Sequence, residues 1–154
     1  MWIFLFTQLL YFLPSVDLSD VELTCPQFKE GQNKLICKIN KTAVDNAGCL
    51  SSPEYVRIDR TVGKITSTPC RAPLPEPSNC KKQNSSLPNS CWCDDSTQDI
   101  FTYIFAYWAN ISQDNGALLE CKYCAITKSP LKIKVCKNIS FGKCSLEIKL
   151  NDSF

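Results

Sequence analysis

The sequence contains no histidine, and this absence limits the chemistry that the chain could perform. Neither a Ser-His-Asp nor a Cys-His nucleophile can be built, and no zinc or haem site with a histidine ligand is possible. The side chain that most often exchanges protons near neutral pH is also missing. Carboxylate and lysine chemistry stay open, but no pair of acidic residues stands out. We therefore expect a protein that is not an enzyme, with no catalytic residues, no metal site and no cofactor.

Clustered positive charge is lacking as well. The chain has 17 Lys or Arg residues against 15 Asp or Glu residues, which gives a formal net charge of +2. A nucleic-acid-binding surface needs a basic face. The lysines within 131–137 instead alternate with apolar residues, as they do on the solvent side of a half-buried strand. We expect no nucleic-acid partner.

The one long apolar run lies at the N-terminus, where Met1–Leu13 precedes Pro14 and Ser15. It is shorter than the roughly 20 residues of a membrane helix and has the length of the apolar part of a signal peptide. Cleavage is expected after Ser15 or Ser19, and a buried N-terminal helix is the alternative. We therefore expect a signal peptide over 1–19, a single mature domain over 20–154, no membrane span and secretion to the extracellular space.

Five Asn-X-Ser/Thr triplets support passage through a secretory compartment, where about 1.6 would arise by chance from the composition. We predict N-glycosylation on exposed segments. The asparagines are Asn40, Asn84, Asn110, Asn138 and Asn151.

The 11 cysteines are expected to form a disulfide framework, because thiols oxidise in that compartment. The pairs Cys121/Cys124 and Cys91/Cys93 could instead be zinc ligands or redox pairs, but no βαβ pattern surrounds the first pair. An odd number leaves one thiol over. Cys144, close to the polar C-terminus, is the candidate for an unpaired or interchain cysteine, and hence for a disulfide-linked homodimer.

Short segments with period-2 alternation predict strands separated by polar turns, which is typical of an all-β protein. Between the early and late segments, residues 67–98 form an insert rich in proline and cysteine. In that insert Asp94, Asp95 and Asp99 could bind calcium, but a solvated acidic turn is favoured because the spacing is not that of an EF-hand. The predicted strands are 34–40, 55–60, 100–109, 117–123, 131–135 and 145–150.

The segment 100–109 is apolar on both faces, which predicts either a strand covered twice or a strand whose outer face is a binding surface. Covered core is the plainer alternative. If one face binds a partner, we expect it to be the aromatic one, made of Phe101, Tyr103, Phe105 and Tyr107.

Cys37 and Cys121 each lie among aliphatic residues on the inward face of a predicted strand, which suits a bridge between two packed sheets. Residues 115–121 have the spacing of the immunoglobulin tyrosine-corner segment, with Asn115 where Asp is usual and Leu119 where the corner Tyr would stand. The chain therefore resembles an immunoglobulin-superfamily domain. The resemblance implies an Ig-like antiparallel β-sandwich, here disulfide-rich and with a Pro/Cys-rich insert.

Two features depart from the immunoglobulin pattern. The interval between Cys37 and Cys121 is longer than usual, and the insert supplies the excess. No Trp follows Cys37 at the position in the third strand, so either the aliphatic residues of 55–60 fill that space or Trp92 or Trp108 reaches into it.

A wider likeness covers nearly the whole mature chain. It is carried by VELTCPQFKEGQNKLICKINKTA at 21–43, by Gly48-Cys49, by CWC at 91–93, by GALLECKYC at 116–124 and by Ser129-Pro130. These segments are similar to a group of secreted or membrane-tethered, cysteine-rich Ig-like ectodomains of invertebrates, molluscs in particular. The resemblance implies a noncatalytic recognition module for an extracellular protein or glycan, in innate immunity or at a cell surface. The alternative is a small cysteine-rich secreted effector, of the toxin, ligand or protease-inhibitor type, that acts through the 67–98 loop.

Overall fold

The computed structural model describes residues 19–50, 55–74, 80, 87–141 and the backbone of 146–150. These residues form nine strands and two short helices, and none of the helices described is long and apolar enough to cross a membrane. The expected all-β, disulfide-rich fold is confirmed. The elements are β1 (Val21–Thr24), β2 (Gly31–Asn40), α1 (Lys41–Ala47), β3 (Tyr55–Val62), β4 (Ile65–Pro73), β5 (Ser90–Ser96), β6 (Ile100–Ala109), α2 (Ile111–Asp114), β7 (Leu118–Lys122), β8 (Lys132–Cys136) and β9 (Leu146–Leu150).

All six segments with clear alternation are strands, but three strands and both helices were not predicted. β1 has four residues, too few for a periodic pattern to be seen. Both β4 and β5 contain residues of the Pro/Cys-rich insert, so part of that insert belongs to the sheet itself. They lie at its two ends, where an unpaired side tolerates the prolines of β4.

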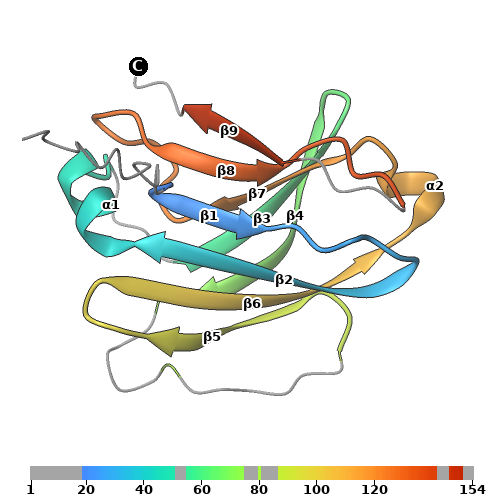
Figure 1. The fold of residues 1–154 in the computed structure, drawn as a ribbon, viewed down its shortest axis with the longest axis horizontal. Coiled ribbons are helices and arrows are strands. Elements are labelled where there is room, and N and C mark those ends of the chain that lie inside the picture. The colour runs from blue at the N-terminus through green and yellow to red at the C-terminus, as the bar shows by residue number, and fades with distance from the viewer. Residues whose placement is uncertain (1–18, 51–54, 75–79, 81–86, 142–145, 151–154) are drawn as a thin grey trace, which may run out of the picture.

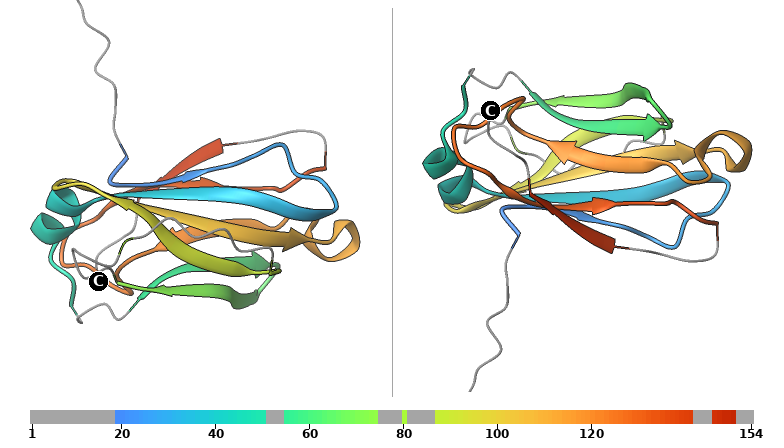
Figure 2. Two further views of the ribbon diagram at one scale, coloured as in Figure 1. Left: turned by 90° about the horizontal axis from the view of Figure 1, so that it is seen from below. Right: turned by 90° about the horizontal axis from the view of Figure 1, so that it is seen from above.

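The strands form one continuous sheet that folds over into two layers (Figures 1 and 2). Its order is β4-β3-β7-β8-β1-β2-β6-β5, and β9 pairs with the outer side of β8. β1 joins the layers, because it pairs antiparallel with β2 and parallel with β8. The sandwich therefore differs from the expectation in two respects: β1 pairs with a strand of each layer, and its pairing with β8 is parallel.

The core lies between the layers and is crossed by the predicted disulfide. Cys37 on β2 and Cys121 on β7 are bonded, with their Cα atoms 6.2 Å apart and no exposed surface on either residue. Val56 and Ile58 fill the space beside this bridge on β3, both at most 1% exposed. Aliphatic side chains thus occupy the place of the missing Trp, and Trp108 stays half exposed.

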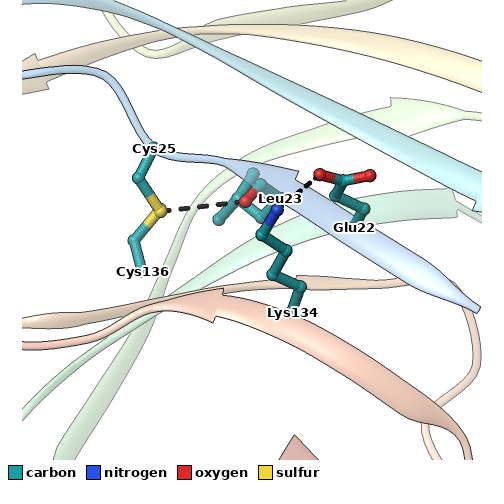
Figure 3. Close-up of a disulfide and its surroundings, with 5 residues drawn as sticks. All are labelled: Glu22, Leu23, Cys25, Lys134 and Cys136. Atoms are coloured by element: carbon teal, nitrogen blue, oxygen red, sulfur yellow. Dashed lines mark hydrogen bonds and ion pairs between the residues drawn. A yellow bond between two sulfur atoms is a disulfide. The ribbon is translucent and has the colours of Figure 1, made fainter. Parts of the chain in front are cut away.

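Two more disulfides join the layers where backbone pairing is short or absent. β1 and β8 share two residue pairs, and there the Cys25–Cys136 bond and an ion pair of 2.7 Å between Lys134 Nζ and Glu22 Oε1 connect them (Figure 3). At the opposite side the end strands β4 and β5 lie next to each other, joined by Cys70–Cys91. The folded sheet is therefore closed on both sides by covalent bonds.

The cost of removing a disulfide should follow its place in this framework. Cys37–Cys121 closes a sequence separation of 84 residues, and Cys80–Cys93 closes 13. Cys49–Cys124 remains bonded in the first variant and already shortens the loop that Cys37–Cys121 closes, so loop length does not separate the two pairs. The Cys37→Ala/Cys121→Ala variant should still lose about 2 kcal/mol more unfolding free energy than Cys80→Ala/Cys93→Ala, because removal of its fully buried sulfur atoms leaves a cavity in the core. Guanidinium denaturation of the two purified variants measures the difference. Equal losses would contradict a central role for the β2–β7 bridge.

Candidate functional site

The prediction that the aromatic face of β6 binds a partner is wrong for three of its four residues. Tyr103, Phe105 and Tyr107 are 0%, 1% and 4% exposed, because this face points between the two layers. Phe101 is half-buried: its ring stacks on Tyr123 with 6.4 Å between centroids, and Lys41 Nζ lies 4.6 Å from its centroid. Tyr103, Phe105 and Tyr107 therefore belong to the core, and a binding surface has to be sought elsewhere.

Two segments at one end of the sandwich are held together and form the first candidate surface. We call residues 47–50, from the last residue of α1 onward, and residues 124–129, between β7 and β8, the joined loops. The Cys49–Cys124 disulfide links them, and Cys49 also forms an isolated antiparallel β-bridge with Thr127. Backbone hydrogen bonds run from Leu50 N to Ile126 O (3.0 Å) and from Lys128 N to Ala47 O (3.0 Å). Cys121 therefore bonds across the core to Cys37, whereas Cys124 bonds to Cys49 in the loop after α1.

The residues at the two ends of α1 explain why Cys49 lies next to Cys124. Asn40 caps the helix, its Oδ1 accepting a hydrogen bond from Ala43 N at 3.1 Å. Gly48 ends the helix with φ 66°, a conformation that favours glycine. A Cβ atom there would also lie 3.3 Å from the Lys128 side chain. This pairing of Asn40 with Gly48 is a capping signal from which α1 could have been predicted.

The joined loops present apolar side chains on a constrained backbone. Leu50 and Ile126 are 54% and 48% exposed, although the backbone that carries them is hydrogen-bonded. Next to Ile126 in the chain, Thr127 is buried and donates from Oγ1 to Ser129 O at 2.6 Å. Such an arrangement suits binding, because little loop entropy remains to be lost when a partner docks.

The acidic residues on β3 and β7 are engaged in ion pairs. Asp59 and Glu120 lie opposite each other in register and are each 5% exposed. Lys122 Nζ lies 3.4 Å from Asp59 Oδ2 and 3.7 Å from Glu120 Oε2, and Arg57 Nε lies 3.2 Å from Asp59 Oδ1. These cations offset the repulsion of two facing carboxylates, so the group stabilises the sheet.

A hollow of about 330 Å³ is lined by residues from the end of β6 and from α2. This end of β6 lies far from α1 (Figure 1). Beneath it Asp114, 3% exposed, accepts hydrogen bonds from Arg60 Nε and from Asn110 N (2.7 Å). Arg60 Nη2 also donates to Gln113 O at 2.6 Å. Although burial lowers the pKa of Arg60, the hydrogen bond and charge of Asp114 outweigh it and raise the pKa. The lining residues are Arg60, Pro69, Asn89, Tyr107, Trp108, Asn110, Gln113 and Asp114.

The remaining predicted residues occupy varied places. Asn40 and Asn110 cap the two helices, and Asn138 is exposed with φ 52°, whereas Asn84, Asn151 and Cys144 lie outside the described residues. Neither closely spaced cysteine pair bonds to itself: Cys91 joins Cys70 and Cys93 joins Cys80. Within the part of the chain that the structure describes, no group of three or more acidic or cysteine side chains could hold a metal ion, Asp94, Asp95 and Asp99 included.

Comparison with known proteins assigns no function to this geometry. No protein-family model, no curated protein and no solved structure matches the chain. The joined loops and the hollow are therefore interpreted from their own residues.

Two buried tyrosines make the stability of the fold sensitive to alkali. Burial, followed by the charge of Tyr123, raises the pKa of Tyr103. Burial, followed by the charge and hydrogen bond of Asp114, raises the pKa of Tyr107. An unfolded tyrosine ionises near pH 10, so the unfolded chain loses these protons first. Below about pH 10 the two protonated tyrosines make their full contribution to the unfolding free energy. Above about pH 10 the unfolding free energy should fall by about 1.4 kcal/mol per pH unit for each tyrosine.

Urea denaturation between pH 9 and 11 measures this loss, and absorbance at 295 nm follows phenolate formation in the folded and the unfolded chain. Tyr107→Phe should reduce the slope of unfolding free energy against pH, because one of the two phenols is gone. A stability that does not change over this range would contradict the prediction.

Proposed function

We propose that this chain is a secreted, noncatalytic recognition module that binds an extracellular partner through the joined loops. The observation that carries the proposal is the exposure of Leu50 and Ile126, at 54% and 48%, on segments locked by Cys49–Cys124 and by backbone hydrogen bonds. Interfaces commonly place apolar side chains at the centre and polar ones at the rim. Here the exposed side chains of Asp45 and Lys128 flank the aliphatic pair along the chain.

Of the two partner classes expected, the joined loops favour a protein over a glycan. Two aliphatic side chains offer contact area but no hydrogen bonds for sugar hydroxyls. The five disulfides are typical of extracellular proteins. The signal peptide and the glycans complete the proposal as expectations from the sequence.

We further propose that the domain is Ig-like, of the invertebrate type that its sequence resembles. An immunoglobulin sandwich places strands A, B, E and D in one layer and C, F and G in the other, with a disulfide between B and F. The layer β1, β2, β6, β5 and the layer β3, β7, β8 support the same assignment, with Cys37–Cys121 at the B–F position. The second layer also carries β4 beside β3, as variable-type domains add a strand there, and β9 beside β8. On this correspondence the joined loops are the B–C and F–G loops, which carry antigen-binding segments in variable domains.

One observation favours the alternative, an effector that acts through 67–98. Leu87 is 69% exposed. It lies between Cys80 and Cys91 in the chain, and both of these cysteines form disulfides, Cys80–Cys93 and Cys70–Cys91. An exposed apolar residue on a constrained segment could also meet a partner. The two candidates therefore predict different sensitive residues.

Fluorescent tetramers of the secreted chain, applied to intact cells of the source organism and read by flow cytometry, test the proposal. The Leu50→Asp/Ile126→Asp variant should lose at least about tenfold in apparent affinity, because a charge would be buried in the contact. Ile65→Asp is the matched control, because Ile65 is 73% exposed at the remote β3–β4 turn. Undiminished staining by the double variant would refute the joined loops, and loss through Leu87→Asp would support the effector.

We also propose that the secreted chain forms a disulfide-linked homodimer through Cys144. The five bridges use the other ten of the 11 cysteines, so no cysteine in the same chain is left to pair with it. Nonreducing gels should show twice the monomer mass, and reductant or Cys144→Ser should abolish that band. A monomer band with and without reductant would rule the dimer out.

A further inference from the structure

We propose that Asn110 carries an N-glycan whose innermost N-acetylglucosamine packs on the ring of Trp108 in the hollow beside α2. This inference rests on one part of the proposed function, passage through the secretory pathway, and not on partner binding. In the transfer, Asn110 Nδ2 attacks the anomeric carbon of a lipid-linked oligosaccharide diphosphate. A C–N bond forms, the bond from that carbon to the diphosphate oxygen breaks, the lipid diphosphate leaves with the electron pair, and Nδ2 gives up one proton.

The side chain of Asn110 is already held in a position that leaves its nitrogen for this bond. Its Oδ1 accepts hydrogen bonds from Ser112 N (3.0 Å) and from Ser112 Oγ (2.6 Å), the hydroxyl of the same Asn-X-Ser triplet. The cap of α2 therefore uses the oxygen alone. Because glycosylation replaces one hydrogen on Nδ2, it would leave the cap intact.

Trp108 provides an apolar surface for a sugar at this position. It stands two residues before Asn110 in an extended segment, which places both side chains on one face, and both line the hollow. One edge of the indole ring lies over Gly31, where a Cβ atom would lie 3.9 Å from Trp108 Cζ2. The ring is nevertheless 50% exposed. A pyranose ring has a face of C–H groups that could cover this exposed aromatic surface.

The hollow has the size and polarity that such a sugar needs. Its volume of about 330 Å³ lies at the lower end of the range of small-ligand sites. Exposed side chains of Asn89 and Gln113 line it and offer amide groups to hydroxyls and to the N-acetyl group. Asn89 Oδ1 also accepts a hydrogen bond from Trp108 N at 3.0 Å, which fixes the backbone beneath the ring.

The triplet at Asn40 provides a matched comparison within the same chain. Asn40 also ends a long strand and caps the following helix through Oδ1. The residue two positions before it is Lys38, where Asn110 has Trp108. A sugar on Asn40 therefore has no aromatic ring in the corresponding position, and its removal should cost less stability than removal of the sugar at Asn110.

The test compares glycans trimmed to a single N-acetylglucosamine on the full chain, produced in eukaryotic cells with its own leader and, in parallel, with a foreign signal peptide. Ser112→Ala removes the Asn110 glycan but keeps the Ser112 N–H that the cap uses, and Thr42→Ala removes the Asn40 glycan but keeps the Ala43 N–H of the other cap. Because Ser112→Ala also removes the hydrogen bond from Ser112 Oγ to Asn110 Oδ1, the same variant is measured in chain produced in bacteria without glycans, and that effect is subtracted. Ser112→Ala should lower the melting temperature by about 3–5 °C, and Thr42→Ala by clearly less. When Trp108 is already replaced by Ala, Ser112→Ala should lower the melting temperature little further.

The outcomes separate this inference from the proposed function. If the chain with its own leader stays inside the cells, natural secretion is contradicted. The chain with the foreign signal peptide then still tests whether Asn110 carries a glycan. Glycopeptide mass spectrometry that finds Asn110 unmodified in the secreted chain would overturn the inference. An undiminished effect of Ser112→Ala in the Trp108→Ala background would overturn the packing on the ring.

Discussion

Three disulfides hold the two layers of this sheet together at the places where hydrogen bonds are few. Cys25–Cys136 supports the two-residue pairing of β1 with β8, and Cys70–Cys91 joins end strands that are not neighbours in the sheet. Cys37–Cys121 crosses the core between them. A chain of this size can bury only a modest core. Covalent closure therefore limits how far the layers can separate, and the rest of the architecture depends on it.

The two candidate surfaces, the joined loops and the hollow, lie at opposite ends of the long strands β2 and β6. At one end α1 leaves β2 and the Cys49–Cys124 bond fastens it to the loop before β8, so that Leu50 and Ile126 are exposed on a hydrogen-bonded backbone. At the other end α2 leaves β6, and the buried Asp114 ties it to Arg60 on β3. The first arrangement suits docking of a partner, while the second shapes a hollow next to a glycosylation triplet.

Strand positions were largely readable from the sequence, because alternation of apolar and polar residues reports one buried face. The bounds of β6 agree with the predicted segment 100–109. The sequence did not show which face of β6 points into the core. Apolar residues occupy both faces, so the alternation that usually marks the buried face is missing. The predicted partner face of Tyr103, Phe105 and Tyr107 is consequently core. β4 and β5 were missed because their prolines and cysteines obscure the strand pattern, although such residues are tolerated at sheet ends.

By itself, the sequence determined the β-rich fold and most strand positions, because each depends on local alternation of residues, and the same alternation placed Cys37 and Cys121 on the inward faces of their strands. The absence of histidine likewise restricted the chemistry, because no way of folding the chain can supply a side chain that it lacks. Only the tertiary structure decided which distant segments meet: Cys49 with Cys124, Arg60 with Asp114, and Trp108 with Asn110 at one hollow. These contacts follow from the order in which the strands pair and from the folding of the sheet onto itself, and neither is written in a local pattern.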